Sequence, residues 1–273
     1  MTDCTERHPA APPNGLAGEG QEGMAKEAQP MTLPPIRRQV VVPAAPDQAF
    51  DVFTEKIGSW WPVERHSVHG ATATAAFRDG RLIETSAEGD EVEWGEVLAW
   101  EPPHLLRMTW HPGHGPEHAG EVEVSFAPVT ASATLVTVTH SGWERFADPA
   151  AARDQYRNGW PRVLGGYAAL LPGPIASGEP VWLVLSHTRA PGAVQPDLAA
   201  HRAFLERLQA RGVLVAAGPF PASGEGMTVV RVPPEEVDLL LRQANNDDLS
   251  VVNGGLEVRV RPWLVTLTGS WLT

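Results

Sequence analysis

The sequence is short of cysteine, of positive charge and of long apolar segments. Cys4 is the only cysteine in 273 residues, so the chain cannot form an internal disulfide, which fits a reducing compartment such as the cytoplasm. Lys and Arg number 21 against 33 Asp and Glu. The resulting net charge of −12 argues against nucleic acid as the main partner, because phosphate binding needs a basic surface.

Two further signals are missing. No run of about 18 apolar residues exists that could span a membrane. No cationic start leads into an apolar core, as it does in a secretory signal. We therefore expect a cytoplasmic protein that has neither nucleic acid nor a membrane as its partner.

Glycine and proline are abundant instead, with 26 residues of each. Many of them lie in the first 35 residues, where too few apolar groups exist to offset the entropy of ordering the chain. We expect residues 1–35 to be a disordered tail. Met24 and Met31 are alternative start positions, so this tail is either a native flexible segment or in part not native.

A second segment rich in glycine and proline divides the rest of the chain. Residues 172–180 break all apolar periodicity, as linkers between domains do. The hydrophobic content of 42% is sufficient for a core on each side. The sequence thus predicts a first domain at 36–172, a linker at 173–180 and a second domain at 181–273.

The first domain has the pattern of an antiparallel sheet followed by a helix. Asp79-Gly80 between two short apolar runs is a hairpin signal. From Trp160 to Leu171, apolar residues recur every three or four positions and form one helical stripe, in which Pro161 predicts a kink or a restart. The predicted strands are 36–43, 75–78, 81–85, 92–101, 105–110, 122–126 and 134–139, and the predicted helices are 46–53 and 160–171.

A sheet wrapped around one long helix can leave an apolar cavity between them. Five motifs accompany this order of elements: Ser59-Trp60-Trp61-Pro62, His66-Ser67-Val68, Trp94-Gly95-Glu96-Val97, His140-Ser141-Gly142-Trp143-Glu144 and Gly159-Trp160-Pro161-Arg162-Val163-Leu164. Together they resemble the START-like (SRPBCC) superfamily, and within it the group named for the C-terminal domain of a heat-shock chaperone ATPase activator. The resemblance implies an α+β helix-grip fold with a cavity for a small hydrophobic molecule.

Large amphipathic side chains are the candidates for the wall of that cavity. Trp60, Trp94 and Trp110 each combine an apolar face with an indole N–H group, although such tryptophans can equally fill the core. His66 follows the Trp-Trp-Pro segment and is expected either at the cavity mouth or in an exposed loop. We expect these four residues to bind a small apolar ligand.

One segment has the composition of a metal site. Three imidazoles and two carboxylates fall within eleven residues, at His111, His114, Glu117, His118 and Glu121. The prolines and glycines among them indicate a flexible hairpin loop, which lacks the rigid ligands that a metal site needs. We expect no native metal there, and only weak, adventitious binding of nickel or zinc.

The second domain has the order β-α-β-β-α-β, which is the ferredoxin-like pattern. Pro196 and Asp197 favour the start of its first helix, and Gly212 favours the end of that helix. The predicted strands are 181–186, 213–217, 227–232 and 256–267, and the predicted helices are 196–212 and 234–244.

Five segments of this region resemble the YCII-related family: His201-Arg202-Ala203-Phe204-Leu205, Gly212-Val213-Leu214-Val215, Ala217-Gly218-Pro219, Asp247 to Gly254 and Arg261-Pro262-Trp263. The resemblance implies a dimeric α+β barrel, in which the sheets of two copies pack face to face, and therefore a homodimer. It also implies a site formed by His201 and Asp248, with Asp247 as the alternative. The chain departs from the family's usual Asp-Pro-Phe at Asp248-Leu249-Ser250.

The residues around His201 agree with such a site. Leucines lie three positions before it and four and seven positions after it, so His201 lies on the apolar face of its helix and points towards the sheet. An imidazole titrates near neutral pH, and a carboxylate partner would orient it for proton transfer. The other interpretation is a buried histidine that is satisfied by a hydrogen bond.

Three functions remain open. The first is a binding protein that holds a small apolar ligand in the first domain and dimerises through the second. The second is an enzyme in which His201 and Asp248 move a proton in an isomerisation, a lactone reaction or a decarboxylation. The third is a chaperone-accessory or protein-interaction role. The sequence has no Gly-x-Ser-x-Gly elbow and no phosphate-cradling glycine loop, and we expect no cofactor.

Overall fold

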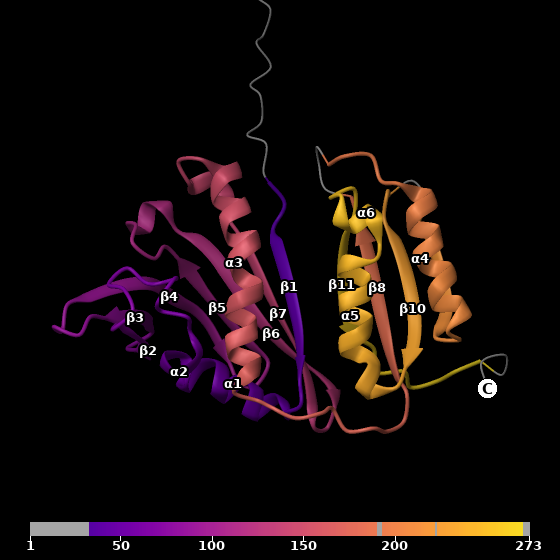
Figure 1. Ribbon diagram of the computed structural model, residues 1–273, viewed down its shortest axis with the longest axis horizontal. Coiled ribbons are helices and arrows are strands. Elements are labelled where there is room, and N and C mark those ends of the chain that lie inside the picture. Colours follow the sequence, from indigo (N-terminus) through magenta and orange to yellow (C-terminus); the bar gives the residue numbers. More distant parts are fainter. Residues whose placement is uncertain (1–32, 190–192, 222, 270–273) are drawn as a thin grey trace, which may run out of the picture. The chain divides into compact units, whose positions relative to one another are not determined.

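The computed structural model describes residues 33–189, 193–221 and 223–269. They form two antiparallel sheets with helices packed against them (Figure 1). The tail expected at 1–35 lies almost wholly outside these residues, and so do Cys4, Met24 and Met31. Within the described ranges, no helix combines the length and the apolar character needed to cross a membrane.

The first sheet has seven strands in the order β1-β7-β6-β5-β4-β3-β2. Neighbouring strands are antiparallel throughout, and β1 completes the sheet by pairing with β7. All seven strands lie where the sequence predicts them, although β6 and β7 are longer. Their bounds are β1 (Ile36–Val42), β2 (Thr74–Arg78), β3 (Arg81–Thr85), β4 (Glu91–Glu101), β5 (Leu105–Trp110), β6 (Gly120–Thr130) and β7 (Ala133–Ser141).

Three helices accompany this sheet: α1 (Pro46–Glu55), α2 (Ile57–Trp60) and α3 (Pro149–Ala169). The mixed α+β arrangement, a large antiparallel sheet with a long helix lying along it, agrees with a helix-grip fold (Figure 1). Short 3-10 turns at Pro116–His118 and Trp143–Arg145 lie in the connections. The helix α3 begins eleven residues before the predicted start, because the Asp148 side chain caps it by accepting a hydrogen bond from the Ala151 N–H at 3.0 Å.

Pro161 neither ends nor restarts α3. A proline inside a helix has no N–H group to donate to the carbonyl four residues earlier, which here belongs to Arg157. The Arg38 guanidinium of β1 donates to that carbonyl at 3.1 Å instead. The backbone oxygen freed by Pro161 is therefore satisfied by the neighbouring strand, and the helix continues past the proline.

The core under α3 is unusually aromatic. Its buried side chains include Trp60, Trp94, Trp110, Trp143 and Trp160. The close approach of α3 to α2 needs Gly166, because a Cβ atom at this position would lie 2.5 Å from the Trp60 carbonyl oxygen. The long helix is thus fixed against the start of the loop that follows Trp60.

The second sheet has four strands in the order β11-β8-β10-β9, again all antiparallel. Its strands are β8 (Val181–Thr188), β9 (Leu214–Pro219), β10 (Gly226–Val232) and β11 (Glu257–Pro262). Its helices are α4 (Leu198–Ala210), α5 (Val237–Asn246), which follows a 3-10 turn at Pro234–Glu236, and α6 (Leu249–Val252). The last strand ends at Pro262 instead of the expected Leu267, and the short α6 was not predicted.

The second core joins the two sheets. Val41 and Leu135 of the first sheet belong to the same buried cluster as side chains of α4, α5 and the second sheet. At the edge, the Gln39 side chain accepts a hydrogen bond from the Val260 N–H at 3.0 Å and donates to the Val260 carbonyl at 2.8 Å. One amide side chain therefore pairs with the edge strand β11 as a neighbouring backbone would.

Candidate functional site

The structure contains a cavity between α3, the end of β5 and the loop after α2, which we call the α3 cavity. Its volume is about 200 Å³. Three indole rings and a phenol contribute to its wall, together with an imidazole and several other polar groups. We call the part of the wall formed by His66, Ser67, Val68 and Gln155 its mouth. The cavity is lined by Trp61, Arg65, His66, Ser67, Val68, Trp110, Pro112, Gln155, Tyr156, Gly159, Trp160 and Val163.

The mouth of the α3 cavity is held in place by one buried carboxylate. Glu84 of β3 has no exposed surface. It accepts hydrogen bonds from the Ser67 hydroxyl, from the Val68 N–H at 2.9 Å and from the His69 N–H at 2.7 Å. The Trp94 indole donates to the same carboxylate at 2.7 Å. Residues 67–69, of which Ser67 and Val68 line the cavity, are therefore held to the sheet by Glu84.

The surroundings of Glu84 keep it ionised. Burial by itself would raise the pKa of Glu84, but the hydrogen bonds from Ser67, Val68, His69 and Trp94 outweigh it and leave the pKa below its ordinary value. A carboxylate that accepts four hydrogen bonds can stay charged in the interior.

Two of the four residues expected to bind a ligand line the α3 cavity, namely Trp110 and His66. The other two, Trp60 and Trp94, do not. The Trp60 indole donates to the Val52 carbonyl at 3.0 Å, and that of Trp94 is occupied by Glu84, so both belong to the core. Sequence reasoning did not assign Trp61, whose ring centroid lies 5.5 Å from that of Trp110.

Next to Trp160, and outside the lining of the cavity, is His140, a buried imidazole that was not singled out as a site residue. Its Nδ1 accepts a hydrogen bond from the Trp160 indole at 3.2 Å, and burial lowers the pKa of His140 to about 3. His66, at the mouth, has a pKa lowered by burial and further by Arg162 and Arg65. Both imidazoles are neutral at pH 7 and can act as hydrogen-bonding groups without adding charge to the cavity.

The histidine-rich loop does not form a cluster of metal ligands. His111 is buried and lies 3.6 Å from Glu93, while the His118 ring meets the Arg145 carbonyl at 3.1 Å. Among the described residues, the group that could hold a metal ion lies elsewhere, at His187, His201 and Asp248.

The structure brings His201 of α4 and Asp248 together across 47 positions of sequence. His201 Nδ1 lies 2.6 Å from Asp248 Oδ2. Asp248 is fully buried and also caps α6, where it accepts a hydrogen bond from the Ser250 N–H at 3.0 Å. Asp247, the alternative partner, is exposed. Of the two aspartates, Asp248 is the one that contacts His201.

A second histidine, His187 of β8, packs against this pair. Its ring centroid lies 4.6 Å from that of His201, and it is only 2% exposed. Neither ring nitrogen of His187 has a hydrogen-bond partner among the described residues. The sequence carried a signal for it, since Leu183, Leu185 and His187 alternate on one face of the strand, but the predicted strand ended at Ser186.

The contact between His201 and Asp248 is that of a hydrogen-bonded pair. Two ligands of one tetrahedral zinc ion lie about 3.3 Å apart, given zinc–nitrogen distances of about 2.0–2.1 Å. The two atoms here are 2.6 Å apart, although all three donors lie within 4.8 Å of one another. The arrangement suits an imidazole oriented by a carboxylate.

His201 and His187 line a second cavity of about 460 Å³, which we call the His201 cavity. Aliphatic and aromatic side chains of α4, β9 and β10 make most of its wall, and Arg189 and Arg202 lie at its edge. The lining residues described here include His187, Arg189, Leu198, His201, Arg202, Leu205, Phe220, Met227 and Leu256.

Comparison with protein families identifies the first region. Residues 43–171 match the family model described as activator of Hsp90 ATPase homolog 1-like protein (AHSA1). The matched region is a little under half of the chain, and because of this similarity we refer to it as the AHSA1-like domain. The match includes every residue that lines the α3 cavity and ends before β8.

Solved structures similar to the AHSA1-like domain each cover half of this chain. They include protein MLL2253 from Mesorhizobium loti (22% identity, 50% of this chain and 96% of that chain, TM-score 0.38). Others are the self-sacrificing resistance protein CalC from Micromonospora echinospora (25%, 50% and 94%, TM-score 0.40) and the Aha1 dimer from Colwellia psychrerythraea (16%, 50% and 95%, TM-score 0.34). No curated protein matches the chain.

Replacing Glu84 by Gln tests the role of this carboxylate in the AHSA1-like domain. The amide keeps the shape but loses the charge, and its NH₂ group would face N–H donors of the loop. We expect the free energy of unfolding to fall by about 3 kcal/mol, and the amides of Val68 and His69 to lose protection in hydrogen exchange. The exposed Glu88→Gln is the control. Retained protection at Val68 and His69 in Glu84→Gln would contradict this role.

The buried histidines predict acid sensitivity. Burial, with a smaller contribution from the nearby His201, lowers the pKa of His187 to about 4, although Asp248 acts in the opposite direction. Below pH 6.5 the unfolded chain binds protons at His187 and His140 that the folded protein does not bind. The free energy of unfolding should therefore decrease as the pH is lowered below 6.5. The slope of this decrease should approach about 1.4 kcal/mol per pH unit for each histidine.

Urea unfolding between pH 7 and pH 5 measures this dependence. His187→Leu should flatten the curve, because the substitution removes one of the two groups without breaking a hydrogen bond within the described residues. His104→Gln, at an exposed position, should leave the slope unchanged. An unaltered slope in His187→Leu would show that His187 is accessible to protons in the folded state.

Proposed function

We propose that the AHSA1-like domain binds a small molecule with a flat apolar body in the α3 cavity. The observation that carries this proposal is a cavity walled by Trp61, Trp110 and Trp160 whose mouth is fixed by Glu84. Its volume of about 200 Å³ slightly exceeds the roughly 150 Å³ that accommodates benzene in an engineered protein cavity. A ligand of one or two rings fits this space.

Polar groups at the mouth add a requirement for the ligand. His66, Ser67 and Gln155 lie beside the indole rings and supply both donors and acceptors. The ligand therefore carries a polar substituent at one end of its apolar body. This is the usual design of small-molecule sites, where a few polar groups orient a mainly apolar ligand.

Gly159 allows the cavity to be filled without disturbing the fold. A Cβ atom on Gly159 would meet the His66 ring at 3.5 Å, an ordinary contact, so a larger side chain would extend into the space. Gly165 on the same helix has nothing within 4 Å of such an atom and serves as the matched control. Both glycines lie within α3, where a leucine improves helix propensity by about 1 kcal/mol.

Native mass spectrometry of protein purified from its host should show a retained small molecule in the wild type and in Gly165→Leu, but not in Gly159→Leu. If the purified protein retains no small molecule, the binding of added one-ring and two-ring aromatic compounds to the three proteins is measured instead. Equal binding to Gly159→Leu and Gly165→Leu would contradict the proposal.

The second sheet supports a second candidate function, which is acid–base catalysis by His201 and Asp248. The favouring observation is their contact of 2.6 Å at the wall of the His201 cavity. Asp248 would orient the imidazole through Nδ1 and stabilise its charged form, leaving the other ring nitrogen to exchange a proton with a substrate. An isomerisation, a lactone reaction or a decarboxylation needs such a proton transfer.

Turnover in a panel of lactones, enol esters and β-keto acids tests this candidate. His201→Gln should lower kcat/KM by about 100-fold or more, as expected for the loss of a general acid–base group. Asp248→Asn should lower kcat and change its pH dependence. Glu206→Gln, at an exposed position on α4 outside the lining of the cavity, is the control. Turnover that survives in His201→Gln would exclude this role.

The resemblance of 181–273 to the YCII-related family, together with its strand order, supports a homodimer through the second sheet. The face of this sheet opposite α4 and α5 presents Val184, Met227 and Trp263, which line a shallow apolar depression. Met227 and Trp263 are 38% and 49% exposed. Two copies packed face to face would cover these side chains.

Light scattering after size-exclusion chromatography should give twice the chain mass of 29.4 kDa. Val184→Glu should give the monomer, because a charge would be buried between two sheets. Leu239→Glu, at an exposed position on α5, is the control and should stay dimeric. A monomeric wild type would refute the dimer.

A further inference from the structure

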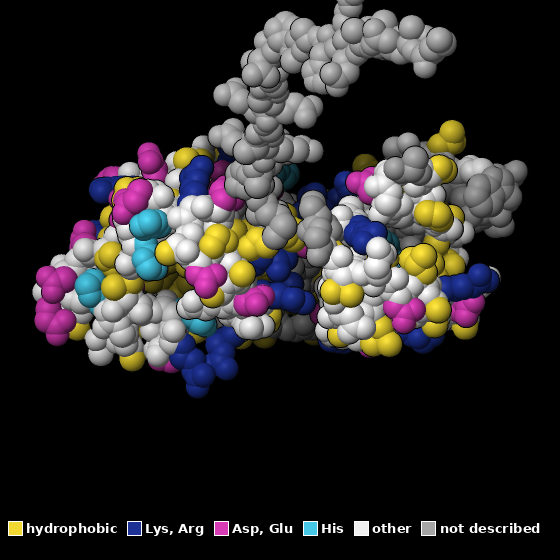
Figure 2. Space-filling model, turned by 90° about the horizontal axis from the view of Figure 1, so that it is seen from above, with side chains coloured by type: hydrophobic (Ala, Val, Ile, Leu, Met, Phe, Trp, Pro, Cys, Tyr) yellow, Lys and Arg dark blue, Asp and Glu magenta, His cyan; other side chains and the backbone are white. Residues whose placement is uncertain are grey.

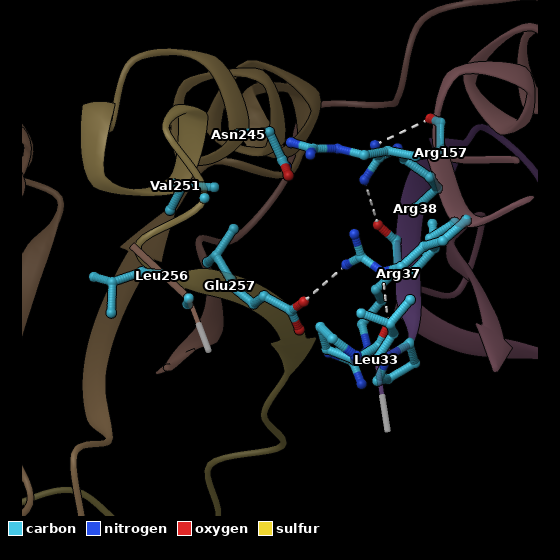
Figure 3. Close-up of a pocket in the computed structure, with 15 residues that line it drawn as sticks. Leu33, Arg37, Arg38, Arg157, Asn245, Val251, Leu256 and Glu257 are labelled. Carbon is cyan, nitrogen blue, oxygen red and sulfur yellow. Dashed lines mark hydrogen bonds and ion pairs between the residues drawn. The ribbon is translucent and has the colours of Figure 1, made fainter. Parts of the chain in front are cut away.

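Four arginines and one glutamate surround a cavity of about 250 Å³ beside the start of β1 (Figure 3). Arg37 and Arg38 come from β1, while Arg153 and Arg157 lie one turn apart on α3. Glu257 of β11 faces them and lies 3.4 Å from Arg153. This cavity is separate from both the α3 cavity and the His201 cavity.

Two of these arginines have structural partners. Arg38 donates to the carbonyls of Arg37 and Arg157, at 2.9 and 3.1 Å, and so replaces the hydrogen bond that Pro161 removes from α3. Arg153 donates to the Pro34 carbonyl at 2.8 Å and pairs with Glu257. The presence of these two side chains is explained by the fold.

The side chains of Arg37 and Arg157 have no such structural partners among the described residues. Among the described residues, the side chains of Arg37 and Arg157 make neither an ion pair nor a hydrogen bond. The Nε atom of Arg37 is buried and has no hydrogen-bond partner there. Burying a guanidinium N–H without an acceptor is unfavourable, and a second uncompensated arginine alongside it adds repulsion.

The charge around the cavity is out of balance. Four positive groups face one carboxylate, in a chain whose net charge is −12. Burial lowers the pKa of Arg38, and the neighbouring Arg157 and Arg153 lower it further, although Glu257 acts in the opposite direction. Figure 2 shows several Lys and Arg side chains together near the middle of one face.

We propose that this arginine-lined cavity binds a small oxyanion with at least two negative charges, such as the phosphate group of a phosphorylated small molecule. Guanidinium groups present paired N–H donors that match the oxygens of phosphate and carboxylate. A dianion would supply acceptors for Arg37 and Arg157. It would also offset the positive charge that remains after Glu257 neutralises one of the four arginines. The cavity is large enough for a phosphate group and a small organic portion.

The test measures binding of pyrophosphate, inorganic phosphate and citrate to the full chain by calorimetry and thermal unfolding, with sodium chloride at equal ionic strength as the reference. Arg157→Gln removes a guanidinium whose side chain makes no hydrogen bond within the described part, so the fold should persist. We expect it to weaken anion binding by roughly tenfold. Glu257→Gln should strengthen binding, because it removes the opposing carboxylate.

Arg78→Gln is the matched control, since it removes one positive charge from an exposed ion pair on β2, away from the cavity. Stabilisation by pyrophosphate alone identifies a phosphate site, and equal stabilisation by citrate identifies a general oxyanion site. Both outcomes support the proposal when Arg157→Gln loses the effect and Arg78→Gln keeps it. Stabilisation no greater than that of sodium chloride, or an equal loss in Arg78→Gln, would overturn it.

Discussion

The buried carboxylate of Glu84 is the interaction on which the α3 cavity depends. A charged group without exposed surface is tolerated only if its oxygens accept hydrogen bonds. Three of its four donors belong to residues 67–69, and two of these residues, Ser67 and Val68, also line the cavity. If the loop left the sheet, Glu84 would lose three of its hydrogen-bond donors and remain as a buried charge without enough partners. The mouth is therefore formed before any ligand arrives, which lowers the entropic cost of binding.

The long helix α3 uses two faces for two different purposes. Tyr156 and Trp160, four residues apart, line the apolar cavity beneath the helix, while Arg153 and Arg157, also four apart, face β1 and β11. Pro161 contributes to both sites, because it leaves the Arg157 carbonyl without its helical donor and Arg38 of the arginine-lined cavity donates to that carbonyl instead. One sequence segment thus positions both the aromatic wall and the arginine-lined cavity, and a shift of α3 would alter both sites.

The strands were predictable because alternating apolar residues mark them, and His201 was predictable because leucines mark the face on which it lies. The first half of α3 was not predictable, because its residues are small or polar and form no apolar stripe. The start of this helix depends on the cap at Asp148. Trp60 and Trp61 are adjacent in sequence. Because α2 ends at Trp60, the side chain of Trp60 packs in the core and that of Trp61 lines the cavity. The choice of Asp248 over Asp247, and the presence of His187 beside it, depend on contacts between segments far apart in sequence.

The central claim is that the AHSA1-like domain binds its ligand among the indole rings of the α3 cavity. The indole N–H resonances of the ten tryptophans, assigned through single Trp→Phe variants, report on it directly. Titration with the retained ligand, or with an aromatic compound that binds, should shift the signals of Trp61, Trp110 and Trp160 and leave that of Trp182 in place. Shifts confined to Trp182 or Trp263 would contradict the account.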